Sequence, residues 1–180
     1  MIRFEKKCKK LKILAISGSA SLESSNTLLL ETVKQQFFDK YDIEVYNDLR
    51  ELPMFRPEDL EKTIPGSVKK LKEKILGSDA VLISTPEYTH NIPAVLKNAL
   101  EWMTASGEFC GKRMLVITFT PKEPRGKYAM ESLLFSLKTL DARIVGTLAI
   151  YKTDSVIEEG KIQLSKEILT ILKEAMSRLE

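Results

Sequence analysis

The sequence predicts an α/β fold in which a parallel β-sheet is covered by helices on both faces. Five short apolar runs rich in β-prone residues recur along the chain, and longer segments with helical periodicity separate them. Several of these runs are apolar at consecutive positions, which is typical of parallel strands buried on both faces. Because crossovers between parallel strands are right-handed, five such strands most often take the spatial order 2-1-3-4-5. The loops after the first and third strands then flank the crevice where doubly wound sheets bind ligands.

The predicted strands are the apolar runs themselves. In chain order they occupy residues 12–17, 43–46, 80–84, 113–118 and 143–150. The predicted helices fill the segments between and after the strands, at residues 27–40, 67–76, 94–103, 130–140 and 164–179. Pro93 stands at a position that opens a helix, and Met130, Leu133, Leu134 and Leu137 lie on one helical stripe. Residues 50–65 contain three prolines and are expected to form a long surface connection that could border a pocket.

Length and composition indicate one soluble globular domain. The 180 residues suit a single domain, so we expect one domain over residues 1–180 with a basic N-terminal tail at residues 1–10. No apolar stretch approaches the roughly 18–20 residues of a membrane helix, and no signal-peptide pattern is present. We therefore expect a cytoplasmic protein without a membrane partner.

Charge and cysteine content narrow the classes of partner. The net charge of +3 comes from a nearly balanced surface, and the basic run at residues 6–10 has no aromatic or recognition motif beside it. We therefore expect a solvated tail and no nucleic-acid partner. Cys8 and Cys110 are far apart and have no metal-ligand spacing, so two ordinary thiols and no metal site are expected.

A loop rich in hydroxyl groups follows the first predicted strand. Residues 17–27 read Ser-Gly-Ser-Ala-Ser-Leu-Glu-Ser-Ser-Asn-Thr and lead into a helix. Backbone N–H groups, the positive end of the helix dipole and hydroxyl donors would converge there on a phosphate. The same residue types are also good helix N-caps, and the sequence alone does not separate the two interpretations. The loop has neither a dinucleotide fingerprint nor a Walker motif, so a single phosphate is the better match.

A second unusual loop follows the third predicted strand. Residues 85–93 read Thr-Pro-Glu-Tyr-Thr-His-Asn-Ile-Pro. They offer a rigid turn, exposed amides and an aromatic ring beside the predicted crevice. A planar heteroaromatic ligand is expected to lie against this loop.

Together these motifs resemble those of the NAD(P)H-dependent FMN reductases, which have a flavodoxin-like fold and include quinone, chromate and azo-dye reductases. The family's phosphate loop, G-S-x-R-x-x-S-x-N, is matched by Gly18, Ser19, Ser24 and Asn26. Its second motif, P-E-Y-N-x-x-x-P-x-x-L-K-N-A-x-[DE]-W, is matched by Pro86, Glu87, Tyr88, Pro93, Leu96, Lys97, Asn98, Ala99, Glu101 and Trp102. The resemblance covers residues 11–150 and implies a flavodoxin-like three-layer sandwich.

The sequence departs from the family pattern at three places. Ser21 stands where the family usually carries Arg, and Thr89 stands where it carries Asn. The loop at residues 120–126 lacks the family's Gly-Gly pair. Lys122 or Arg125 could supply the missing positive charge. These departures leave open a family member that does not hold flavin tightly.

The resemblance implies FMN as cofactor and NADPH or NADH as electron donor. Hydride would pass to the flavin and then to a free flavin, a quinone or a similar small acceptor in a ping-pong cycle, with no catalytic side chain. The residues expected to bind the cofactor are Ser17, Ser19, Ser21, Ser24, Ser25, Asn26, Thr27, Pro86, Glu87, Tyr88, Thr89, His90 and Thr120.

The resemblance also bears on assembly and on the competing class of function. Family members are commonly dimers or tetramers, so a homodimer or homotetramer is expected, with residues 103–113 and the preceding helix as a contact surface. The alternative is a flavodoxin-like protein that binds FMN and passes electrons to a protein partner. Flavodoxins have a strongly acidic surface, and the net charge of +3 argues against that alternative.

Overall fold

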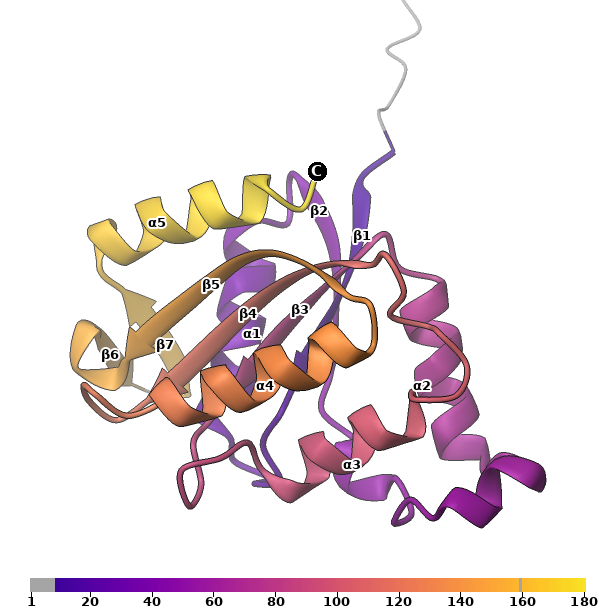
Figure 1. Cartoon of the computed structure of the whole chain (residues 1–180). Helices are drawn as coiled ribbons and strands as arrows, with labels where there is room; N and C mark the ends of the chain where they lie inside the picture. The colour runs from indigo at the N-terminus through magenta and orange to yellow at the C-terminus, as the bar shows by residue number, and fades with distance from the viewer. Residues whose placement is uncertain (1–8, 159) are drawn as a thin grey trace, which may run out of the picture.

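The computed structural model describes residues 9–158 and 160–180. Its centre is a parallel sheet of five strands in the order β2-β1-β3-β4-β5 (Figure 1). The strands are β1 (Leu11–Ser17), β2 (Tyr41–Tyr46), β3 (Ala80–Thr85), β4 (Arg113–Thr120) and β5 (Arg143–Tyr151). The predicted strand order is confirmed, and each predicted strand overlaps the observed one.

Five helices cover the two faces of this sheet (Figure 1). They are α1 (Ser25–Gln36), α2 (Gly66–Leu76), α3 (Ala94–Trp102), α4 (Lys127–Thr139) and α5 (Lys166–Ser177). One apolar cluster joins α2, α3 and α4 to the sheet, and a second joins α1 and α5 to its opposite face. The fold is therefore the three-layer, flavodoxin-like sandwich that the sequence predicts.

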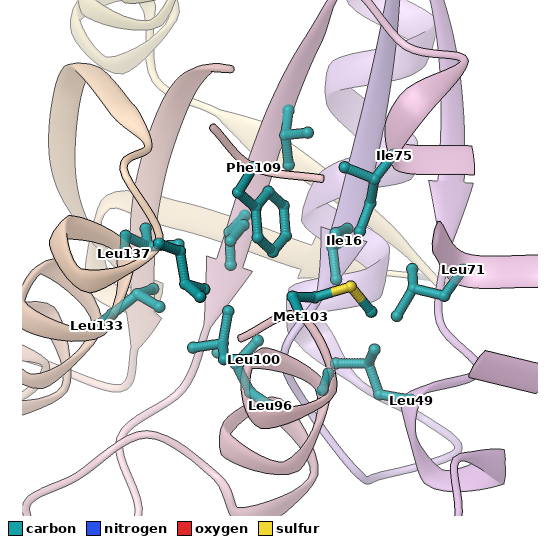
Figure 2. Close-up of a cluster of buried hydrophobic side chains, with 14 of the residues drawn as sticks. Ile16, Leu49, Leu71, Ile75, Leu96, Leu100, Met103, Phe109, Leu133 and Leu137 are labelled. Carbon is teal, nitrogen blue, oxygen red and sulfur yellow. The ribbon is translucent and has the colours of Figure 1, made fainter. Parts of the chain in front are cut away.

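The burial of the strands explains why their apolar runs are continuous. All six residues of β3 are buried, because its alternate side chains enter the two clusters on opposite faces. Figure 2 shows the first cluster, which contains Ile16 of β1 together with Leu71, Leu96 and Leu133 from α2, α3 and α4. Trp102 and Met103 are buried in this cluster, which assigns both side chains to the core.

The connection after β2 is anchored to the core by two side chains of α3. It contains two 3-10 helices, η1 (Leu49–Glu51) and η2 (Pro57–Glu61). The Asn98 side chain accepts a hydrogen bond from the Phe55 N–H at 2.7 Å and donates to the Pro53 carbonyl at 3.0 Å. The indole N–H of Trp102 donates to the same carbonyl at 2.8 Å. Asn98 thus braces this connection, whereas Lys97 forms an ion pair with Glu101.

A hairpin that the sequence analysis does not predict follows β5. The antiparallel strands β6 (Ser155–Glu158) and β7 (Lys161–Leu164) come after the 3-10 helix η3 (Lys152–Asp154). Ile162 of β7 is buried in the cluster that holds α1 and α5, so the hairpin packs on the helical layer. The prediction that residue 164 begins the last helix is wrong, because Leu164 ends β7 and Ser165 caps α5.

The structure also bears on the predicted basic tail, the cysteines and the predicted absence of a membrane helix. Most of the predicted basic tail, residues 1–8 with Cys8, lies outside the described residues, and Lys9 and Lys10 are exposed. Cys110 is a free, exposed thiol. No helix within the described parts of the chain has the length and apolar character needed to span a bilayer.

Candidate functional site

The loop between β1 and α1 forms one side of a cleft at the carboxyl ends of the strands. The Gly18 N–H donates to the Ser84 carbonyl at 2.8 Å, and a Cβ at Gly18 would lie 2.8 Å from Leu96 Cδ2. A side chain at position 18 would therefore force Leu96 or Thr85 to move. Ser24 caps α1, since its Oγ accepts from the N–H groups of Asn26 and Thr27. The positive end of the α1 dipole thus opens at this loop.

Asn26 ties this loop to the next two strands of the site. Its side chain is 2% exposed. Its Oδ1 accepts from the Ser84 hydroxyl of β3 at 2.7 Å, and its Nδ2 donates to the Phe119 carbonyl of β4 at 3.2 Å. Three strand ends are therefore held together by one buried carboxamide.

The loop after β3 forms the second side as a tight turn. Tyr88 and Asn91 exchange two backbone hydrogen bonds, each of 2.9 Å. The two residues between them, Thr89 and His90, have φ angles of 49° and 56°. Both lie in the left-handed region, which Asn and Gly enter easily and a β-branched residue does not. The turn therefore explains why the family pattern has Asn where this chain has Thr89.

Glu87 connects this turn to the third loop. Its Oε2 accepts from the backbone N–H groups of Tyr128 and Ala129 at 3.0 and 3.1 Å, which are in the first turn of α4. Gly126, the N-cap residue of α4, makes no side-chain cap. Glu87 thus supplies the cap from another loop, and its negative charge meets the positive end of the α4 dipole.

The third loop, after β4, packs over buried threonines. The Thr120 hydroxyl donates to the Arg125 carbonyl at 2.9 Å. Gly126 has a φ angle of 99°, and a Cβ there would lie 2.8 Å from Thr118 Oγ1. That hydroxyl is buried and has no hydrogen-bond partner among the residues the structure describes. The loop is therefore fitted closely to β4 without the Gly-Gly pair of the family.

These loops enclose a cleft of about 290 Å³, close to the lower end of the range for small-molecule sites. Its lining residues come from all three loops and from the segment after β5: Ser19, Ser21, Glu23, Ser24, Ser25, Asn26, Pro86, Glu87, Tyr88, Phe119, Pro121, Arg125 and Lys152. A smaller cavity of about 190 Å³ adjoins it and shares Glu87 and Arg125, with Thr89 and His90 as its other lining residues. Both lie where doubly wound sheets bind ligands.

A larger hollow elsewhere is a weaker candidate. Its volume is about 460 Å³, and its lining includes Lys12, Asp42, Glu44, Lys74 and Gly77. It lies at the amino-terminal halves of β1 and β2, whereas ligands of such sheets bind beyond the carboxyl ends. Two of its charged residues, Lys74 and Glu44, are already paired with each other. The cleft beside the serine loop therefore remains the candidate site.

The thirteen residues predicted to bind a cofactor occupy three kinds of position. Eight line the main cleft: Ser19, Ser21, Ser24, Ser25, Asn26, Pro86, Glu87 and Tyr88. Thr89 and His90 line the adjoining cavity. Ser17 and Thr27 form a hydrogen bond of 2.8 Å with each other, and Thr120 is buried beneath the third loop. Contact between these residues and a cofactor stays a prediction.

Several lining residues are absent from the predicted set. They are Glu23, Phe119, Pro121 and Lys152, and Arg125 enters only as one of two possible cations. Lys122, the other possible cation, does not line the cleft. Glu23 and Pro121 were signalled by their places within the loops after the first and fourth strands. Lys152 follows the fifth strand and carries no local signal.

The fold and the cleft define a flavodoxin-like nucleotide-binding protein. The sheet order is β2-β1-β3-β4-β5, and a serine-rich loop of the kind that binds phosphate joins β1 to α1. The family model described as NADPH-dependent FMN reductase matches residues 11–154, and the chain belongs to this family. The matched residues include all three loops of the cleft and Lys152 after β5.

Named relatives agree with this assignment. The chain is 42% identical to a subunit of the NADH:(hydroxy)cinnamate reductase of Vibrio ruber, over 53% of this chain and 46% of the relative. It therefore spans only about half the length of that relative. It is 26% identical to the quinone reductase of Escherichia coli, over 95% of this chain and 98% of the relative. The structure of the flavoenzyme NAD(P)H:(acceptor) oxidoreductase of Paracoccus denitrificans, with 23% identity, shares the fold with a TM-score of 0.74 over 94% of this chain and 95% of that chain.

The residues of the cleft fit a flavin mononucleotide. The cleft contains serine hydroxyls and the amino end of α1, which suit a phosphate. The lining also includes Pro86 and the exposed Tyr88, which suit a planar aromatic ring, whereas the Phe119 side chain is buried in the core. Among the residues that the structure describes, no group of three or more His, Cys, Asp or Glu side chains is placed to hold a metal ion. The chemistry of the lining therefore matches an organic cofactor with one phosphate.

Proposed function

We propose that this chain is an FMN-dependent oxidoreductase that passes hydride from NADH or NADPH to a free flavin, a quinone or a similar small acceptor. The observation that carries the proposal is the cleft itself. A hydroxyl-rich helix N-terminus and an aromatic-bearing turn face one space at the carboxyl ends of β1, β3 and β4. The family assignment supports the same cofactor.

The chain's own residues would bind and position the cofactor. Ser19, Ser21 and Ser25 would hold the phosphate with the α1 amino end, and the rigid turn after Pro86 would orient the ring. FMN, when bound, supplies the hydride-accepting and hydride-donating chemistry. The protein then needs no side-chain acid, base or nucleophile, and donor and acceptor would use the same open face in turn.

The names of relatives support the class of donor and acceptor. One 40% identical relative is an NADH-dependent flavin reductase subunit of Lactobacillus johnsonii, although it is matched over only 48% of its length. The Escherichia coli relative, matched over 98% of its length, is a quinone reductase. Both names describe small redox-active acceptors or flavins, which suits a cleft of about 290 Å³.

A visible spectrum tests the proposal directly. The protein purified with added FMN should show flavin absorption bands after gel filtration, and anaerobic NADH or NADPH should bleach them. Subsequent addition of a quinone should restore the bands. A colourless protein that takes up no FMN would instead support the non-flavin-binding member, and bands that neither nucleotide bleaches would support an electron carrier.

We also propose that the chain forms a homodimer or homotetramer in the cytoplasm. The exposed Phe135 on α4 supports a covered face there, beside a cavity of about 220 Å³ between α3 and α4. In the segment after α3, Met103 and Phe109 are buried in the core, whereas residues 104–107, 110 and 111 are exposed and open to a contact. Light scattering coupled to gel filtration tests the assembly, and a monomer at micromolar concentration would contradict it.

A further inference from the structure

The serine loop of the cleft lacks a positive charge of its own. Between residues 17 and 27 the only charged side chain is Glu23, which lines the cleft and is exposed. A phosphate monoester carries about two negative charges at neutral pH. The amino end of α1 supplies only about half a positive charge. A phosphate held here would therefore meet one carboxylate and no cation from its own loop.

Two cations from distant parts of the chain line the same cleft. They are Arg125, before α4, and Lys152, in η3 directly after β5. None of the ion pairs formed among the described residues includes either side chain. Both charges are therefore available to a ligand, in contrast to Lys72 and Lys97, which are paired with carboxylates.

The two cations differ in position. Arg125 also lines the adjoining cavity with Thr89 and His90, so it stands between the two spaces. Lys152 lines only the cleft that contains the serines. The hairpin that follows Lys152 packs through β7 against α1, the helix whose amino end lies at the serine loop. Because β5 runs parallel to β4 and Tyr151 pairs with Thr120, Lys152 follows a strand that ends at the same edge of the sheet as the serine loop.

The local structure around Lys152 holds the segment in place. The Tyr151 N–H donates to Asp154 Oδ2 at 3.3 Å, and the Ser155 hydroxyl donates to the Lys152 carbonyl at 3.1 Å. Burial, followed by the carboxylates of Glu123 and Asp154, raises the pKa of Tyr151, so this neighbouring phenol stays neutral. The backbone of Lys152 is thus held at the edge of the cleft.

We propose that Lys152 binds the phosphate of the flavin and replaces, from the segment after β5, the cation that the serine loop lacks at Ser21. The inference rests on the proposed function, because it takes FMN as the ligand. It assigns Arg125 to the space shared with the adjoining cavity rather than to the phosphate. It also predicts that Glu23 opposes phosphate binding.

Comparison of FMN with riboflavin isolates the phosphate. Dissociation constants of both flavins for the full chain, freed of bound flavin, are measured by quenching of flavin fluorescence. Lys152→Gln should bind FMN about fivefold more weakly, which is near the upper range for a partly exposed ion pair. Its affinity for riboflavin should stay unchanged. Lys152→Arg should keep most of the affinity for FMN.

Two further variants sharpen the test. Lys161→Gln removes an exposed lysine from β7 of the same hairpin, outside the cleft lining, and should change neither affinity. Glu23→Gln should bind FMN more tightly and riboflavin equally well. Because exposed charges are screened by salt, wild-type affinity for FMN should fall with ionic strength, and this dependence should be shallower in Lys152→Gln.

The outcomes separate the inference from the proposed function. Unchanged FMN affinity in Lys152→Gln, or equal losses for FMN and riboflavin, would overturn the role of Lys152. A wild-type protein that binds FMN no more tightly than riboflavin would overturn it too and would leave the oxidoreductase proposal standing. A wild-type protein that binds neither flavin would overturn both.

Discussion

Replacement of Asn26 with Ala is expected to lower both the stability of the fold and its affinity for FMN. Asn26 is 2% exposed, and its carboxamide accepts a hydrogen bond from the Ser84 hydroxyl at 2.7 Å and donates one to the Phe119 carbonyl at 3.2 Å. In Asn26→Ala both partners stay buried and lose their bond. Each such loss costs about 1–3 kcal/mol, so the free energy of unfolding should fall by about 2–6 kcal/mol.

Asn98 provides a matched control. It is also a buried asparagine, 7% exposed, and its side chain bonds to Phe55 N–H and the Pro53 carbonyl. Asn98→Ala should therefore cost a similar amount of stability. Its partners belong to the connection after β2, which does not line the cleft. Its effect on FMN affinity should be small.

Urea unfolding and flavin titration test the pair together. Both variants should unfold at lower urea with unchanged m values, because the surface exposed on unfolding is the same. Asn26→Ala should bind FMN about tenfold more weakly, which corresponds to about 1.4 kcal/mol. Asn98→Ala should bind it with nearly wild-type affinity. Equal losses of affinity in the two variants, or an Asn26→Ala protein as stable as wild type, would refute the role given to Asn26.

Three further predictions concern stability. Thr89→Asn should raise the melting temperature by about 2–4 °C, because Asn tolerates the φ angle of 49° better than Thr does. The control Asp141→Asn, at a φ angle of 54°, should change the melting temperature little. An unaltered melting temperature in Thr89→Asn would show that the turn is not strained. Thr118→Val should stabilise the protein by about 1 kcal/mol in urea unfolding, because it removes a buried hydroxyl that has no partner among the described residues. The control Thr85→Val breaks a hydrogen bond of 3.0 Å to the Pro86 carbonyl and should destabilise the protein. Burial, followed by the carboxylates of Asp48 and Glu51, raises the pKa of Tyr46 from 10.0 to about 12. The stability that the protonated Tyr46 contributes is therefore present below pH 10 and is lost as the pH rises from 10 toward 12. Unfolding curves across this range should show a weaker pH dependence for Tyr46→Phe than for wild type.

The sheet could be predicted from sequence because its signals are local. A run such as Ala80–Thr85 is apolar at successive positions only because both faces of β3 are covered, and a window of a few residues contains that information. Helix positions were equally readable from their stripes. Helix ends were less so: α1 begins at Ser25 rather than at residue 27, because the side chain of Ser24 was free to cap it.

The hairpin after β5 was missed for a physical reason. Its strands have four residues each, and of these only Ile162 is buried. Leu164 fits the apolar stripe of α5 as well as it fits a strand, so the periodicity did not separate the two. Gly160, with a φ angle of 71°, marked the turn but could not show what the hairpin packs against. That depends on α1, which is far away in the sequence.

The same limit applies to the chemistry of the site. A motif match places Glu87 and Asn26 at the cleft, but the contacts of each side chain depend on residues that the motif does not contain. The Glu87 carboxylate accepts from the first turn of α4, and the Asn26 carboxamide bonds to β3 and β4. Both therefore support the loops through bonds within the protein. The charge at the cleft shows the reverse case, since Lys152 lies outside both motifs and reaches the cleft because β5 ends at the same edge of the sheet as β4. A cation missing from a loop can thus be replaced from any segment that the topology brings to the same strand ends, and the sequence of the loop alone does not determine its affinity for a phosphate.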